Sequence, residues 1–181
     1  MIINPIKDTQ MISSKDQTKQ WRKSQDWYIN GKKNECELYQ KRQFEDIVQC
    51  KLSKTNKRLF MVNNTLVKIA NPLKTDQGFE YTENFDGEFK IDNTTFLVNF
   101  KFTCDQGGAQ LRTLREVYHF IKTQMEFIKR HSSTEIYFIN ILDGNTSYTH
   151  KDQFKNLKTN RIFIGDMQEF AIHWNQLKRI N

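Results

Sequence analysis

The sequence has few cysteines and no long apolar segment. Its three cysteines, Cys36, Cys50 and Cys104, form no CxxC pair, which argues against a disulfide framework and against a cysteine-based zinc site. No apolar run approaches the roughly 18–20 residues that a membrane-spanning helix needs. The N-terminal residues also lack the pattern of a secretory signal. We therefore expect an intracellular, cytoplasmic protein that has no membrane partner.

Two further kinds of site have little support. The four histidines are His119, His131, His150 and His173. Their spacing is not one that is recognisable as a set of metal ligands. Cys104 has no histidine placed beside it by any motif, so it is a weak candidate for a nucleophile. These features argue against a histidine-rich metal site and a cysteine hydrolase.

The composition is that of a basic, globular protein with one core. The chain has 181 residues, of which 37% are hydrophobic, and it contains 14 phenylalanines. That length fits a single domain with enough apolar mass for a core. The formal net charge of +7 and the isoelectric point near 9.3 favour a polyanionic partner, because basic side chains that contact phosphates release counterions.

The polar, lysine-rich residues 1–33 predict an N-terminal extension that packs on the core, with some helix around residues 15–29. A domain of residues 34–181 follows. It is expected to begin with a helix of about residues 34–53, with Asn34 as its N-cap. The apolar positions of this helix recur with a period of 3.6 residues and are Leu38, Phe44, Ile47, Val48 and Leu52.

Strands and helices are then expected to alternate. The apolar patterns and turn signals predict two hairpins, one of residues 58–62 and 65–69 and one of residues 85–91 and 95–103. A helix of 109–131 and a strand of 135–142 are expected next. A short helix from about 150, a strand of 161–164 and a final helix follow, and Asp166 is expected to cap this last helix, which ends near Arg179. This order predicts an α/β fold.

The second hairpin brings three polar side chains together. In its second strand Phe96, Val98, Phe100 and Phe102 alternate with Leu97, Asn99, Lys101 and Thr103, so Asn99 and Lys101 face the same side of the sheet. Asp86 stands near the start of the first strand. A carboxylate could hold Mg²⁺ there, and a neighbouring lysine could orient an attacking water during phosphodiester hydrolysis.

From Glu35 to Ile164 the sequence resembles the PD-(D/E)XK nuclease superfamily, most of all type II restriction endonucleases. The resemblance depends on Asp86, on Asn99-Phe100-Lys101 after twelve intervening residues, on a Gly107-Gly108 turn before a helix, and on a later strand that ends in Asp143-Gly144. It implies a restriction-endonuclease-like core, in which a central mixed β-sheet is flanked by helices. It also implies Mg²⁺ as cofactor, with Mn²⁺ as a substitute, double-stranded DNA as substrate, and a homodimer.

The resemblance assigns a role to each candidate residue. Asp86 and the position of Asn99 would hold the cation, and Lys101 would orient the attacking water. Glu45 is the candidate acid from the first helix, with Glu37 second. The residues that would position the DNA phosphate are Gln110, Arg112 and Arg115. Gly107 and Gly108 could turn tightly at positive φ and let that phosphate approach the start of the helix.

Asn99 departs from the family pattern, which has Asp or Glu at this position. Asparagine offers a neutral oxygen and therefore removes one negative charge from the cation site. Three explanations stay open: a natural variant that uses asparagine, a nearby acid such as Glu88 in its place, or an engineered aspartate-to-asparagine change.

The leading hypothesis is a Mg²⁺-dependent, restriction-like DNA endonuclease, in which a natural or engineered replacement at Asn99 could remove activity. The first alternative is a catalytically silent nucleic-acid-binding module that keeps the nuclease fold, and the second is a nicking or homing nuclease.

Overall fold

The computed structural model describes residues 36–69, 79–103 and 107–180, together with residues 20, 23–26 and 30. The predicted N-terminal extension and its helix therefore lie almost entirely outside the described residues, as does the N-cap predicted at Asn34. No helix in the described part of the chain is both long and apolar enough to cross a bilayer.

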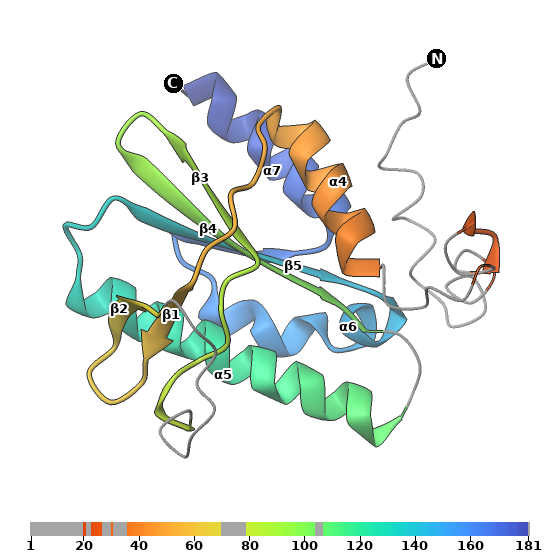
Figure 1. The fold of residues 1–181 in the computed structure, drawn as a ribbon, viewed down its shortest axis with the longest axis horizontal. Helices are drawn as coiled ribbons and strands as arrows, with labels where there is room; N and C mark the ends of the chain where they lie inside the picture. The colour runs from red at the N-terminus through yellow and green to blue at the C-terminus, as the bar shows by residue number, and fades with distance from the viewer. Residues whose placement is uncertain are drawn as a thin grey trace.

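A four-stranded mixed sheet forms the centre of the fold (Figure 1). Its strands are β3 (Gly87–Ile91), β4 (Thr94–Phe102), β5 (Ile136–Asp143) and β6 (Ile162–Gly165), in that spatial order. β3 runs antiparallel to β4, whereas β4, β5 and β6 run parallel to one another. The three parallel strands therefore end at the same edge of the sheet.

Helices cover both faces of this sheet (Figure 1). α4 (Cys36–Val48) and α7 (Met167–Ile180) lie on one face, and α5 (Gly108–Arg130) lies on the other with α6 (Asn145–Thr149) and the 3₁₀ helix η3 (Lys151–Leu157). The fold is thus α/β, with a mixed sheet flanked by helices as the sequence predicted. The short α6 was not expected, because Gly144 was interpreted only as the end of a strand.

The predicted alternation in β4 is confirmed by the two hydrophobic clusters of the core. Val98 and Phe100 belong to the cluster under α4 and α7, where Phe100 meets Phe44 edge to face at 5.5 Å between ring centroids. Leu97 belongs to the opposite cluster, which contains Leu114 of α5. Because successive strand residues point to opposite faces, Asn99 and Lys101 lie on the α5 side.

The first predicted hairpin forms, but it does not join the main sheet. β1 (Lys57–Phe60) and β2 (Thr65–Lys68) make a separate two-stranded sheet beside α5 (Figure 1), and Asn64 takes the left-handed backbone conformation in their turn. The outer edge of β3 instead pairs with Ser53, whose backbone exchanges two hydrogen bonds of 2.9 Å with Glu88. A short antiparallel contact therefore precedes β3 in the chain.

The ends of two helices differ in how well the sequence predicted them. α4 ends at Val48 rather than near residue 53, because Gln49 turns to a φ of 56°. Leu38, which was placed on its apolar stripe, is 51% exposed. At the start of α7, Asp166 is the predicted cap: its Oδ1 accepts a hydrogen bond from the Glu169 N–H at 2.8 Å, and Glu169 accepts one in return from the Asp166 N–H.

Candidate functional site

Asp86 and Lys101 lie close together where β3 begins and β4 ends. The Asp86 backbone N–H donates to Val98 O at 2.8 Å, which continues the β3–β4 pairing. The Asp86 carboxylate then turns to β4 and accepts a hydrogen bond from the Phe100 N–H at 2.6 Å between Oδ2 and N. The carboxylate thus lies against the strand that carries Asn99 and Lys101.

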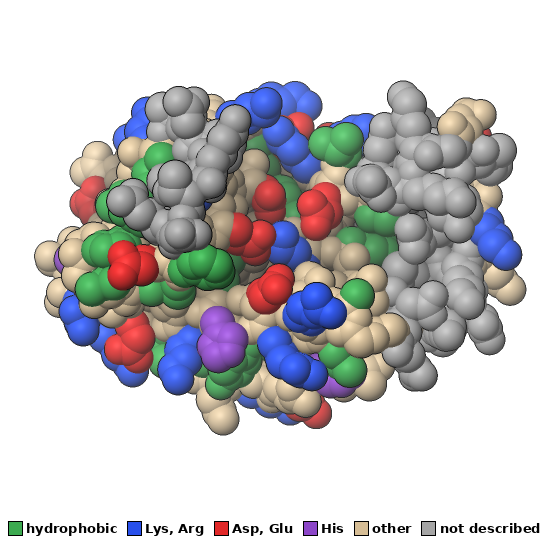
Figure 2. All heavy atoms as spheres, turned by 60° about the horizontal axis from the view of Figure 1, so that its bottom comes forward, with side chains coloured by type: hydrophobic (Ala, Val, Ile, Leu, Met, Phe, Trp, Pro, Cys, Tyr) green, Lys and Arg blue, Asp and Glu red, His purple; other side chains and the backbone are tan. Residues whose placement is uncertain are grey.

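The Lys101 ammonium is surrounded by carboxylates and is only 14% exposed. Its Nζ lies 3.1 Å from Glu83 Oε2 and 4.0 Å from Glu37 Oε1. Burial disfavours the charged form, but the attraction of Glu83, Glu37 and Asp86 outweighs it and raises the pKa of Lys101 above its usual range. Lys101 therefore stays cationic at neutral pH and can stabilise negative charge beside it. Acidic and basic side chains gather at the centre of one face of the molecule in Figure 2.

Asp86 differs from an ordinary surface aspartate. The residue as a whole is exposed, yet the protein atoms around its carboxylate raise its pKa to about 6, against the opposing effects of the Phe100 N–H and of Lys101. The nearby Glu37 and Glu83 raise this pKa further. Such crowding of negative charge is relieved by a cation, so the carboxylates of this cluster would gain from one.

Asn99 lies between these residues in sequence but is fully buried. Its Nδ2 donates to Asn140 Oδ1 on β5 at 3.4 Å, and Asn140 exchanges two side-chain hydrogen bonds with Gln124 on α5, at 2.7 and 3.0 Å. The Oδ1 atom of Asn99 has no hydrogen-bond partner among the described residues. Asn99 therefore belongs to a buried amide network and has one oxygen left to bind another group.

The helix acid beside Lys101 is Glu37, the second candidate, and not Glu45. Both Glu45 oxygens bind the segment that follows α4: Oε1 accepts from the Leu52 N–H and Oε2 from Lys51 Nζ, each at 2.9 Å. Eight residues separate the two acids, which is about 12 Å along a helix. Glu45 thus binds the segment that follows the C-terminal end of α4, whereas Glu37 lies at the N-terminal end of the helix.

Glu88, the acid considered as a replacement for Asn99, is paired elsewhere, since its Oε2 lies 2.6 Å from Lys57 Nζ. The acid that does stand at the cluster is Glu83, which the sequence did not single out because it follows no periodic pattern.

Gln40 was also missed. It is fully buried, and its Nε2 donates to Lys101 O at 3.0 Å and to Asp143 Oδ2 at 2.7 Å. A signal for Gln40 existed, since it is a polar residue on the buried stripe of α4 that Cys36, Phe44 and Val48 define.

The predicted phosphate ligands lie on the first turns of α5. Arg112 and Arg115 are exposed and Gln110 is half-buried, and no described hydrogen bond or ion pair joins any of them to Asp86 or Lys101. Gly107 has a φ of −78° and Gly108 begins the helix, so neither takes the left-handed conformation that was expected. A Cβ at either glycine would meet no atom within 4 Å, so this turn does not require glycine.

The donor atoms suit Mg²⁺ better than a metal that needs a full protein cage. In the described ranges no group of three or more His, Cys, Asp and Glu side chains is placed to hold a metal ion. Mg²⁺ commonly binds through one or two carboxylates and fills its other positions with water and substrate phosphate. The Asp86 carboxylate could supply one such ligand, whereas the unbonded Asn99 Oδ1 is shielded from solvent.

Asp143 connects this region to the rest of the core. It is fully buried at the end of β5, and its two oxygens accept hydrogen bonds from Gln40 Nε2 and, at 3.1 Å, from the Met167 N–H of α7. Burial raises the pKa of Asp143 to about 7. Its carboxyl group thereby links α4, β5 and the start of α7 behind the Asp86–Lys101 cluster.

Stability should fall between about pH 5 and pH 7 because of Asp143. The folded state binds its proton more tightly than the unfolded state, where the pKa is about 3.9, so this contribution is full below the unfolded pKa and is lost as the pH rises through about 7. The loss should be about 2–3 kcal/mol over that range. Urea unfolding at a series of pH values measures it. Asp143→Asn should make the profile less steep, mostly between about pH 6 and pH 7, because Asp86 also has a raised pKa, of about 6, and contributes a slope of the same sign below it. The exposed Asp152→Asn should leave the profile unchanged, and an equally steep profile in Asp143→Asn would exclude this origin.

Comparison of the chain with protein-family models, with curated proteins and with solved structures finds no match.

Proposed function

We propose that the chain is a metal-dependent endodeoxyribonuclease of the PD-(D/E)XK type, with double-stranded DNA as its substrate. The observation that carries the proposal is the convergence of Asp86 and Lys101 at the end of the β3–β4 hairpin, with the Glu37 carboxylate of α4 beside Lys101. Sequence positions that the resemblance assigns to one catalytic centre are thus neighbours in space.

The order of elements supports the same proposal. The resemblance implies a helix, three strands, a helix and a fourth strand, with the catalytic residues on the second and third strands. In this chain α4 is followed by the isolated Ser53 bridge to β3, the separate hairpin of β1 and β2, and then β3, β4, α5 and β5. With the Ser53 bridge in the place of the first strand and β1–β2 as an insertion, β3 and β4 would be the second and third strands of the main sheet, and Asp86 immediately precedes β3.

Each residue of the site would have a separate task in hydrolysis. Asp86 and the oxygen of residue 99 would hold Mg²⁺, which when bound polarises the phosphate and lowers the pKa of a bound water. Lys101 would orient the attacking water and stabilise the negative charge that develops on the phosphate oxygens. Glu37 and Glu83 keep Lys101 protonated and in place through their charges. A symmetric dimer would let two such sites cut both strands of a palindromic sequence.

Plasmid cleavage in the presence of Mg²⁺ tests the proposal. Lys101→Met is expected to lower the cleavage rate by about 100-fold, because it removes the cation next to the reacting phosphate while keeping the apolar stem. Duplex binding, measured by fluorescence anisotropy, should change little. Lys51→Met is a matched control, since that lysine is 87% exposed and pairs with Glu45, away from Lys101. Cleavage that survives Lys101→Met unchanged would contradict the proposal.

A catalytically silent DNA-binding module is the second candidate. The specific observation in its favour is that Asn99 lies in a fully buried amide network with Asn140 and Gln124, where its Oδ1 is shielded from solvent and therefore from a hydrated cation. This candidate predicts duplex binding without cleavage both in the chain as it stands and in Asn99→Asp. The nuclease proposal predicts cleavage in at least one of the two.

A further inference from the structure

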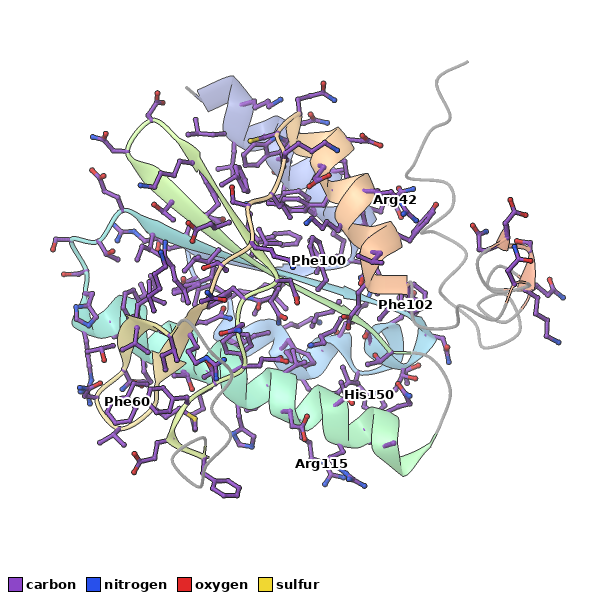
Figure 3. The ribbon with its side chains drawn as sticks, in the orientation of Figure 1. Arg42, Phe60, Phe100, Phe102, Arg115 and His150 are labelled. Atoms are coloured by element: carbon purple, nitrogen blue, oxygen red, sulfur yellow. The ribbon has the colours of Figure 1, made fainter. Side chains whose placement is uncertain are left out.

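A second group of basic side chains lines a groove between α5 and η3. The groove has a volume of about 350 Å³. Tyr118 and Phe154 form its apolar wall, with ring centroids 5.8 Å apart, and its polar lining comes from Arg115, His119, His150 and Gln153. Figure 3 shows Arg115 projecting from α5 away from the sheet, and His150 where α6 meets η3.

The charge of this groove has one sign. Arg115 and two histidines line it, and no Asp or Glu is among the lining residues. The larger cavity at the ends of β5 and β6, of about 590 Å³, is different, because its lysines share it with Asp152, Asp166 and Glu169. A lining of cationic and neutral groups favours an anion, whereas the mixed lining of the larger cavity favours neither sign.

The polar groups of the groove are oriented for a ligand. His150 Nδ1 lies 2.9 Å from Thr146 O, and since a carbonyl only accepts hydrogen bonds, Nδ1 carries the hydrogen and Nε2 is left for another partner. Arg115 and His119 are four residues apart on α5 and therefore share one face of the helix. Within the described chain, none of Arg115, His119 and His150 forms an ion pair.

We propose that this groove binds a phosphate group, with Arg115 as its main donor, with His119 and His150 as further donors when their rings are doubly protonated, and with Tyr118 and Phe154 against the attached sugar or base. A guanidinium matches the planar geometry of phosphate oxygens, and a volume of about 350 Å³ leaves room for more than the phosphate alone. The phosphate can belong to a DNA strand that crosses α5 from the Asp86–Lys101 site, in which case the inference rests on the proposed function. It can also belong to a free nucleotide.

Two binding measurements on the full chain test the groove and identify its ligand. Isothermal titration calorimetry with thymidine monophosphate and with inorganic phosphate measures the free-ligand source. Fluorescence anisotropy of a labelled duplex, titrated without Mg²⁺ at several salt concentrations, measures the DNA source. Arg115→Gln and His150→Gln are compared with Arg42→Gln, which removes an exposed arginine from α4 on the opposite face (Figure 3). Arg115→Gln alters only an exposed side chain, so it keeps the test valid if His150→Gln disturbs α6.

A DNA ligand predicts about tenfold weaker duplex binding in Arg115→Gln and in His150→Gln, with a salt slope that is lower by about one, and no effect of Arg42→Gln. A free nucleotide predicts calorimetric binding of thymidine monophosphate that both groove variants lose, with duplex affinity unchanged. The proposal is overturned if neither variant changes either measurement. Failure of the nuclease proposal is distinguishable, because it would appear as absent or Lys101-independent cleavage whatever happens at the groove.

Discussion

Asn99→Asp is expected to raise the rate of Mg²⁺-dependent plasmid cleavage by about 100- to 1000-fold. Asparagine presents one neutral oxygen at this position, whereas aspartate would add a second carboxylate to that of Asp86. Mg²⁺ in phosphoryl-transfer sites is typically held by one or two carboxylates, so the added charge should strengthen cation binding. Gel analysis of supercoiled, nicked and linear plasmid gives the rate.

The buried amide network should accept this substitution. Asn99 now donates to Asn140 Oδ1, and an aspartate has no N–H to donate. If the amides of Asn140 and Gln124 both turn over, their two mutual hydrogen bonds are kept and Asn140 Nδ2 faces residue 99, but the 3.4 Å hydrogen bond from Asn140 Nδ2 to Phe163 O is lost. The new carboxylate would then be hydrogen-bonded but still buried, and a buried charge without a counterion is costly.

That cost gives a readout that does not depend on cleavage. The melting temperature of Asn99→Asp should be lower than that of the unchanged chain without Mg²⁺ and should rise more steeply when Mg²⁺ is added, since a ligand of the folded state stabilises it. Asn140→Asp is the matched control, because it makes the same change in the same network one strand away. It should lose stability without gaining cleavage. If Asn99→Asp gains neither cleavage nor a Mg²⁺-dependent melting temperature, residue 99 does not hold the cation.

Gly144→Ala is expected to lower the free energy of unfolding by about 3–5 kcal/mol. Gly144 has a φ of 100°, and a Cβ built there would lie 1.9 Å from Thr103 O and 2.5 Å from Thr103 C. These are backbone atoms of the segment that directly follows β4, so they can move only by displacing the end of the strand that carries Lys101. Thr103 O also accepts a hydrogen bond from the Thr146 N–H of α6 at 3.2 Å. Urea unfolding followed by circular dichroism measures the change.

Gly108→Ala is the control for this prediction. Gly108 lies in the first turn of α5, and a Cβ there would meet no atom within 4 Å. Alanine is also the better helix former, so this variant should be as stable as the parent or more stable, by up to about 1 kcal/mol. Equal losses in both variants would show that the left-handed conformation of Gly144 is not the cause.

The local pattern of the sequence was enough to predict the elements of the central sheet and their order. The alternation of β4 is read correctly because successive strand residues point to opposite faces, with a fixed period of 2.0 residues. The same alternation placed Asn99 and Lys101 on one face. The spacing from Asp86 to Lys101 then predicted a pair that the fold does bring together, since the two flank a short hairpin and their proximity is local.

Only the tertiary structure decided which distant residues join that pair. Periodicity says that a helix residue is buried but not which end of the helix meets a strand, so it could not separate Glu37 at the cluster from Glu45 at the far end of α4. The position of Glu83 could not be predicted for the same reason, because its place beside Lys101 depends on the path of the loop before β3. Sequence periodicity therefore determined the secondary-structure elements and the proximity of Asp86 and Lys101. The packing of α4 and of that loop against β4 determined which charges surround Lys101, because contacts between separate elements depend on the whole arrangement of the core.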